Sequence, residues 1–197
     1  MNLHEAFPIA RIIVPFLLLS NAALAICRGN RRSRRVRIAA PVICLAVLLL
    51  PVNGLAIFEY FNGIVGEGSV TLMLLLGWAM ACQMGCLRAP MRTDLYAVRN
   101  ALAVVGILLY PSALGLLPWD VYALGYRPTA LLLALLALVI WAWMTKRTIA
   151  ATAILVAVAA FDVSLLESDN LWDYLVDPLV TLWAWGWVLS GLWHKQP

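Results

Sequence analysis

The residues best suited to chemistry stand close together near the C-terminus, in the stretch DVSLLESDNLWDYLVDP. It contains Asp162, Glu167, Asp169, Asp173 and Asp177. Oxygen-rich clusters of this kind suit calcium or magnesium. Asp169 and Asp177 are also well placed as helix N-caps, the second because a proline follows it at the first helical position. We therefore favour capping and solvation for this acidic cluster, with partner docking or a cationic ligand as alternatives, and we assign no metal.

Asp162 is the most unusual of these acids because it falls about one helical turn inside an apolar stretch, where a carboxylate usually faces a partner or a wet cavity. Arg11 lies at a similar depth in the first apolar stretch, and Glu59 and Arg127 are expected near the same level. We expect an internal ion pair between Arg11 and Asp162. A ligand or ion site formed by these residues, or snorkelling of the charges to the interface, is the alternative.

A cluster of arginines follows the first apolar stretch, in the sequence RGNRRSRRVR. Basic clusters beside a membrane span attract anionic lipid headgroups and set orientation. We expect Arg31, Arg32, Arg34 and Arg35 to contact anionic lipid. A phosphate-bearing ligand or an acidic partner is the alternative for the same residues.

Histidine and cysteine are too few or too scattered to indicate a cofactor. Only His4 and His194 are present, and both stand outside the apolar stretches, which argues against bound haem or a histidine-rich zinc site. Cys27, Cys44, Cys82 and Cys86 are expected to be reduced packing residues. Nucleophile, metalloprotease and nucleotide-binding motifs are absent. We therefore expect no cofactor and favour a role other than catalysis.

Tryptophans are concentrated in the last apolar stretch. Trp183 and Trp187 are four residues apart and would share one helix face, whereas Trp185 would point elsewhere. Ordinary helix packing is the preferred interpretation of the pair. A docking ridge or a groove for a lipid chain is the alternative.

The elements that would position these residues are apolar helices. The chain has 197 residues, of which 64% are hydrophobic and 12% charged, far from the balance of a soluble domain. A membrane-crossing helix needs about 20 apolar residues. We expect a polytopic transmembrane helical bundle of seven spans forming a single domain over 1–197, with spans near 8–27, 38–58, 69–87, 100–118, 128–145, 148–166 and 178–193.

Charge is sorted between alternate connectors. Most of the 14 basic residues fall in the first, third and fifth connectors and the C-terminal tail, whereas nearly all 10 acids fall on the other side. Basic residues mark the cytoplasmic side, which predicts an outer N-terminus and an inner C-terminus. The same sorting explains the net charge of +4 without a nucleic-acid partner. Six spans are the alternative if the proline-broken stretch 100–118 is re-entrant or interfacial.

We expect an integral membrane protein, of the bacterial cytoplasmic (inner) membrane, in contact with lipid and with a membrane-protein partner or a second copy of itself. The leading hypothesis is an accessory or scaffold subunit of a membrane assembly in envelope lipid or glycan handling. The alternatives are a small transporter or channel with an outward-facing site at Arg11 and Asp162, and a membrane-embedded lipid-modifying enzyme using the outer carboxylates.

Overall fold

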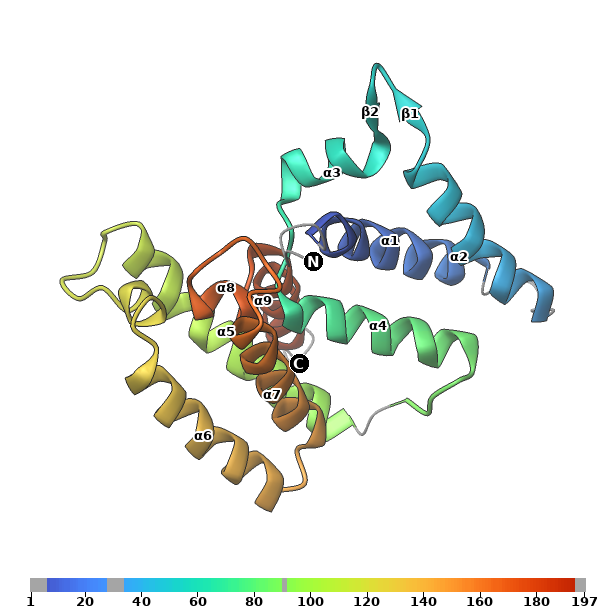
Figure 1. Cartoon of the computed structure of the whole chain (residues 1–197). Helices are drawn as coiled ribbons and strands as arrows, with labels where there is room; N and C mark the ends of the chain where they lie inside the picture. The colour runs from blue at the N-terminus through green and yellow to red at the C-terminus, as the bar shows by residue number, and fades with distance from the viewer. Residues whose placement is uncertain (1–6, 28–33, 90–91, 194–197) are drawn as a thin grey trace. The chain divides into compact units, whose positions relative to one another are not determined.

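The structure is a computed structural model that describes residues 7–27, 34–89 and 92–193 (Figure 1). It is mostly helical, and the described residues divide into two compact units. Unit 1 contains the residues up to Gly68 together with Leu72–Ala89. Unit 2 contains Ser69–Thr71 and the described residues from 92 onward. The expectation of one domain over 1–197 stays a prediction.

Unit 1 is built from helices and one β-hairpin. Its elements are α1 (Phe7–Ile26), α2 (Arg34–Leu48), β1 (Pro51–Val52), β2 (Leu55–Ala56), α3 (Ile57–Val65) and most of α4 (Val70–Met84). The strands are antiparallel, with Pro51 opposite Ala56 and Val52 opposite Leu55. Asn53 and Gly54 form the turn with φ of +49° and +88°. An Asn-Gly pair adopts such left-handed angles readily, so it sets a tight hairpin directly after α2.

A proline within α1 explains how α1 is attached to α3. Pro15 has no backbone N–H, so the carbonyl of Arg11, four residues earlier, has no intrahelical donor. Asn62 of α3 supplies one, because its Nδ2 donates to the Arg11 carbonyl oxygen over 2.8 Å. The Arg11 side chain also pairs with Glu67, with Nε 2.9 Å from Oε1. Arg11 is therefore fixed to the segment after the hairpin through both its backbone and its side chain.

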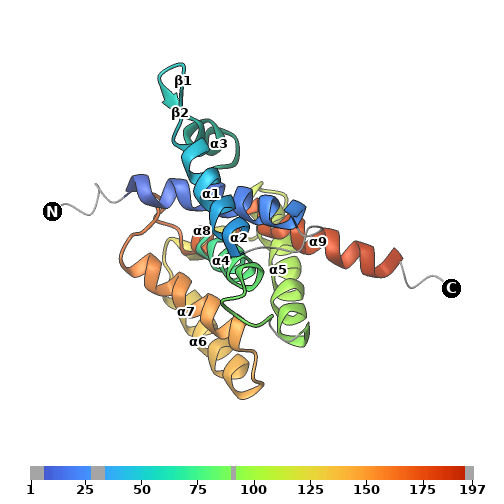
Figure 2. The same cartoon turned by 90° about the vertical axis from the view of Figure 1, so that its right-hand side faces the viewer.

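Unit 2 contains α5 (Arg92–Ala113), the 3-10 helix η3 (Tyr122–Gly125), α6 (Thr129–Met144), α7 (Thr148–Asp162), α8 (Leu171–Leu175) and α9 (Pro178–Trp193). Helices α6 and α7 lie side by side as an antiparallel pair (Figures 1 and 2). Helix α7 also packs on α5 and α8, and α9 packs on α5. A Cβ on Gly106 of α5 would stand 2.3 Å from Cγ2 of Thr181, so glycine allows the close approach of α9.

The first turns of α5 and α7 are joined by polar contacts. Asp94 is buried, and its Oδ2 accepts from the Ile149 backbone N–H at 3.0 Å and from the Thr148 hydroxyl at 3.1 Å. Arg147 donates in return to the Thr93 carbonyl oxygen. Asp94 therefore satisfies N-terminal groups of α7 from a neighbouring helix, which fixes the relative position of α5 and α7 at this end of the unit.

The prediction of seven spans is wrong, and so is the alternative of six. Among the described residues, only Thr93–Ala113 of α5 forms a helix long and apolar enough to cross a membrane. Helices α4 and α7 have 15 residues and α6 has 16. At about 1.5 Å per residue, 15 residues span about 22 Å, short of the roughly 30 Å of a hydrocarbon core. The stretch 38–58 fails for another reason, because α2 ends at Leu48 and the hairpin follows.

We predict that Asn62→Ala lowers the stability of the protein by about 1–2 kcal/mol, because the Arg11 carbonyl then has no donor. The matched experiment adds Pro15→Ala, which restores an N–H to α1 and lets the helix satisfy that carbonyl itself. Thermal unfolding in mild detergent should therefore show a smaller effect of Asn62→Ala in the Pro15→Ala background, with a coupling of about 1 kcal/mol. Purely additive effects would contradict the role given to Asn62.

Candidate functional site

The acidic stretch singled out by the sequence lies at one end of unit 2, where it meets the segment that follows α5. We call residues 112–127 together with residues 162–177 the acidic end. Its carboxylates are in different environments: Asp162, Glu167 and Asp169 are exposed, Asp173 is half-buried and Asp177 is buried. From the sequence, these acids were predicted to form one cluster. The structure separates them into a solvated group and two acids with defined hydrogen bonds.

Asp173 stands at the centre of a polar network. Both of its carboxylate oxygens accept from the Tyr122 hydroxyl at 3.0 Å, and the Ser168 hydroxyl donates to Oδ2. Ser168 Oγ in turn accepts from the Asn170 backbone N–H at 3.1 Å. The carboxylate of Asp173 therefore joins η3 to the loop before α8, and both its oxygens are already engaged.

Asn170 is the N-cap of α8 and lies fully buried. Its Oδ1 accepts from the Trp172 backbone N–H at 2.9 Å, while its Nδ2 donates to the Tyr122 carbonyl oxygen at 3.1 Å. The expectation that Asp169 caps this helix is therefore wrong by one residue. Asparagine and aspartate cap equally well, but only the amide also supplies a donor, and this position needs both functions.

Asp177 is a helix cap, as the sequence predicts. Its Oδ1 accepts from the Val180 backbone N–H at 2.9 Å in the first turn of α9. Its Oδ2 accepts from the Ser69 backbone N–H at 2.8 Å, a contact between segments more than 100 residues apart that the sequence does not indicate. One carboxylate thus fixes the start of α9 and the residue before α4.

The segment around η3 is held by further hydrogen bonds. Trp172 Nε1 donates to the Val121 carbonyl oxygen at 3.0 Å. The Ser112 hydroxyl accepts from the Val121 N–H at 2.6 Å and donates to the Trp119 carbonyl oxygen at 3.2 Å. Asp120 accepts from the Ala123 N–H at 2.9 Å. The polar groups of this segment therefore connect it to α5 and α8.

A buried tyrosine fixes the return from α7 to α8. The hydroxyl of Tyr174 donates to the Leu166 carbonyl oxygen and accepts from its N–H, both at 3.0 Å. Its ring packs edge-on against Phe161, with ring centroids 5.3 Å apart. Tyr174 is fully buried, so its hydroxyl satisfies backbone groups that would otherwise be buried without partners.

The environment of Tyr122 favours its protonated form. Burial raises the pKa of the Tyr122 phenol, and the charge of Asp173 raises the pKa further. Tyr122 is therefore a donor at neutral pH. Among the described residues, no group of three or more His, Cys, Asp or Glu side chains is arranged to hold a metal ion.

The four residues proposed as a ligand or ion-pair site are divided between the units. In unit 1, Arg11 pairs with Glu67, and Glu59 Oε2 accepts from the Ala56 N–H at 2.6 Å at the start of α3. In unit 2, Asp162 ends α7 and Arg127 precedes α6, and both are exposed. The pairing of Arg11 with Asp162 joins residues of different units and stays a prediction. Glu67 was not predicted as the partner of Arg11. It stands in the loop GEGS, and the sequence of this loop does not indicate that the Glu67 side chain turns toward α1.

The basic and sulfur-containing candidates lie in unit 1. Arg34 and Arg35 begin α2 and are exposed, whereas Arg31 and Arg32 lie outside the described residues. Contact of these arginines with anionic lipid stays a prediction. Cys27, Cys44, Cys82 and Cys86 are free thiols, and the Cys82 thiol lies 3.3 Å from the Arg88 carbonyl oxygen.

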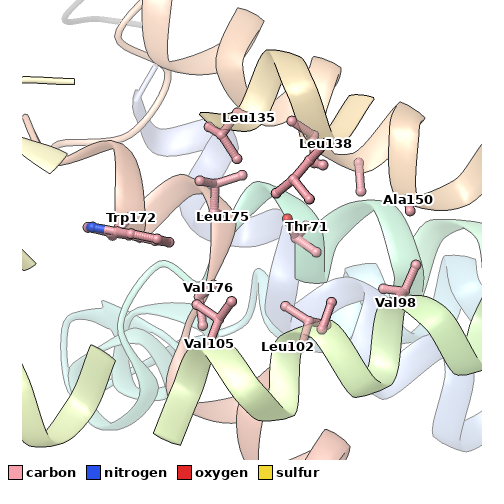
Figure 3. Close-up of a pocket in the computed structure, with 13 residues that line it drawn as sticks. Thr71, Val98, Leu102, Val105, Leu135, Leu138, Ala150, Trp172, Leu175 and Val176 are labelled. Carbon is pink, nitrogen blue, oxygen red and sulfur yellow. The ribbon is translucent and has the colours of Figure 1, made fainter. Parts of the chain in front are cut away.

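An apolar pocket adjoins the acidic end, between α5 and α6 (Figure 3). Its volume is about 120 Å³. Leu135 and Leu138 of α6 face Leu102 of α5 across it, and Trp172 closes one end. The sequence gives no signal for this pocket, because its walls come from elements far apart in the chain. Trp172 links the two features, since its ring lines the pocket and its Nε1 belongs to the polar network.

Comparison of the chain with protein families, curated proteins and solved structures finds no match. The geometry described above is therefore the basis for any proposal of function.

We predict that Gly125→Ala disrupts the acidic end, because a Cβ on Gly125 would stand 1.7 Å from Oδ1 of Asn170. The amide is fully buried and its hydrogen bonds would be broken if it moved away, so we expect a loss of stability of about 1–3 kcal/mol in thermal unfolding. Gly186→Ala is the matched control, since Gly186 lies in α9 with no atom within 4 Å of the added carbon. A loss of similar size in both variants would refute the contact.

The raised pKa of Tyr122 predicts a specific loss of stability at alkaline pH. In the unfolded chain the phenol ionises near pH 10, but in the folded protein it stays protonated to higher pH. The folded state is therefore favoured fully below about pH 10 and progressively less above it, as the unfolded phenol loses its proton. Unfolding measured from pH 8 to 11 should show a steeper decline for the wild type than for Tyr122→Phe; equal slopes would exclude this linkage.

Proposed function

We propose that this protein is an integral membrane protein that serves as an accessory or scaffold subunit of a membrane assembly. The observation that carries the proposal is the contrast within unit 2 between the ends of the helices and their sides. Polar side chains at the ends bond to other segments of the unit, whereas the sides of the helices expose large apolar residues.

The exposed sides of α5 and α6 supply the first support. Ile107 of α5 is 58% exposed and Leu133 of α6 is 66% exposed. They belong to a larger set of exposed apolar residues on these two helices: Val104, Ile107, Leu108, Leu133, Leu136, Leu138 and Ile140. Apolar surface of this extent is unfavourable in water and is typical of contact with lipid or with another protein. A buried helix of a soluble protein can match α5 in length and composition, so the surface carries more weight than the length of α5.

Aromatic and charged residues at the ends of unit 2 supply further support. Trp119 and Tyr126 are exposed at the acidic end, and Trp141 and Trp143 are exposed near the far end of α6. Tryptophan and tyrosine favour the interface between lipid and water. Lys146 and Arg147 lie between α6 and α7, at the end of unit 2 away from the acidic end, and basic residues there favour the cytoplasmic side. We accordingly propose the bacterial cytoplasmic membrane as the location, with α5 as the helix that crosses it.

The tryptophans of α9 support a docking role. Trp185 packs on α5, where its Nε1 donates to the Ala103 carbonyl oxygen at 3.0 Å and its ring meets Tyr110 edge-on. Trp183 and Trp187 are exposed, so the prediction that Trp185 points away from them is confirmed. Trp187 is 54% exposed, and Cζ of Arg99 lies 6.0 Å from the centroid of its ring. We propose that Trp183 and Trp187 form the docking ridge for an apolar partner helix.

We expect the full chain to sediment with membranes after an alkaline wash and to purify in mild detergent with a stoichiometric protein partner. Replacing both Trp183 and Trp187 by alanine should remove most of the partner, because exposed tryptophans supply much of the contact energy in such interfaces. Replacing Trp141 and Trp143, which are also exposed but lie at a helix end, is the matched control and should retain it.

Two results would contradict the proposal. Recovery in the supernatant after the alkaline wash would exclude integration into the membrane. A monodisperse monomer without a partner in mild detergent would exclude the scaffold role. Mass spectrometry of the co-purified partner would also test the expectation that the assembly handles envelope lipid or glycan.

A further inference from the structure

The pocket between α5 and α6 is a separate feature from the docking ridge on α9. Val98, Leu102 and Val105 of α5 face Leu135 and Leu138 of α6 across it (Figure 3). Ala150 and Ala153 of α7 line a further wall, and Trp172, Leu175 and Val176 line the end nearest the acidic end. Helix α6 packs on α7, and α7 packs on α5, so α7 holds the two facing walls.

The lining selects an apolar occupant. Thr71 and Trp172 are the only lining residues with a polar side-chain atom, and Nε1 of Trp172 is engaged by the Val121 carbonyl oxygen. A water molecule needs two or more polar partners to be held in a cavity, and these walls do not offer them. The pocket therefore does not fit a charged substrate, an ion or a stable water molecule.

The position of the mouth indicates where the occupant comes from. Ala101 of α5 and Leu138 of α6 line the pocket and are also exposed, whereas Ala153 and Leu175 are buried. The exposed lining residues belong to the same apolar helix sides that we propose to face lipid. An occupant that enters past Ala101 and Leu138 therefore comes from the hydrocarbon region.

We propose that this pocket binds a segment of a phospholipid acyl chain. The volume of about 120 Å³ is similar to that of an apolar cavity that stays dry and accepts benzene or xenon, which is the size of a short run of methylenes. The inference depends on the proposed membrane location of unit 2, but it does not depend on the scaffold role.

Packing supplies the reason for binding. Side chains that line a void lose van der Waals contacts on one side, and the surrounding helices relax only partly to recover them. A lipid chain beside α5 and α6 can enter the pocket and restore these contacts. Because the chain comes from hydrocarbon and not from water, the gain is in van der Waals contact and not in the hydrophobic effect. The bound chain should therefore exchange with the bilayer and should stabilise unit 2 while it is present.

The experiment uses the full-length protein in detergent micelles and a phospholipid with dibromostearoyl chains, which quench tryptophan fluorescence on contact. For each protein, the quenching is the loss of tryptophan fluorescence in the brominated lipid relative to the unbrominated lipid. The quenching of Trp172 itself is the difference between the wild type and Trp172→Phe. We expect the brominated lipid to quench this contribution strongly, because the Trp172 ring lines the pocket.

Ala150→Leu is the pocket-filling variant, and Ala134→Leu is the matched control on an exposed position of α6 that does not line the pocket. Filling should reduce the quenching of Trp172 about fivefold and remove the thermal stabilisation given by added lipid, since the new side chain occupies the space. The control should behave as the wild type does. Leu138→Ala, which widens the mouth, should increase the quenching, so the proposal is still tested if Ala150→Leu does not fold.

Equal quenching of Trp172 in the filling and control variants, or none in the wild type, would overturn the proposal. Failure of the lipid site and failure of the scaffold role give different results. Ala150→Leu changes the pocket but leaves the docking ridge of Trp183 and Trp187 unchanged. Loss of lipid quenching with the protein partner retained would support the lipid site as an independent feature. Normal lipid quenching in a protein that purifies without a partner would support the lipid site and exclude the scaffold role.

Discussion

A single buried amide, that of Asn170, joins the segments on which unit 2 depends. Its oxygen caps α8 and its nitrogen holds the carbonyl of Tyr122, 48 residues earlier in the chain. The contact is possible because Gly125 has no side chain at the point where the amide lies against η3. Once η3 is fixed, the Tyr122 hydroxyl meets Asp173, and the Trp172 ring is held over the end of the pocket. The polar network of the acidic end and the adjoining apolar pocket therefore both depend on the hydrogen bonds of Asn170.

The sequence predicts much of the helical content, because apolar runs and caps are local features. The stretch 178–193 matches α9, and 128–145 differs from α6 by one residue at each end. Asp177 followed by Pro178 marks the start of α9 correctly. Hydropathy alone does not show where a helix ends within an apolar run. The turn at Asn53 and Gly54 interrupts such a run, and the prediction of spans failed because it counted apolar residues rather than helical ones.

The candidate site was predicted less completely, for a physical reason. Clustering of acids drew attention to the correct stretch, 162–177, but the groups that organise it are mostly neutral. Asn170, Tyr122 and Ser168 carry no charge, and Tyr122 comes from a distant segment. A neutral polar side chain can be recognised as part of a site only once its partners are known. A charged residue in an apolar stretch stands out from the sequence alone. Arg11 illustrates the same limit, since its unusual position is visible in the sequence but its partner Glu67 is not.

The proline in α1 has a consequence for the order in which the chain assembles. Arg11 and Asn62 are 51 residues apart, so the donor for the Arg11 carbonyl is synthesised long after α1 itself. Until α3 emerges from the ribosome, α1 has an open position in its backbone hydrogen bonding, in the same turn as a charged side chain. Helix α1 is therefore completed late, although it is synthesised before α3. The turn at Asn53 and Gly54, which brings α3 back beside α1, completes it.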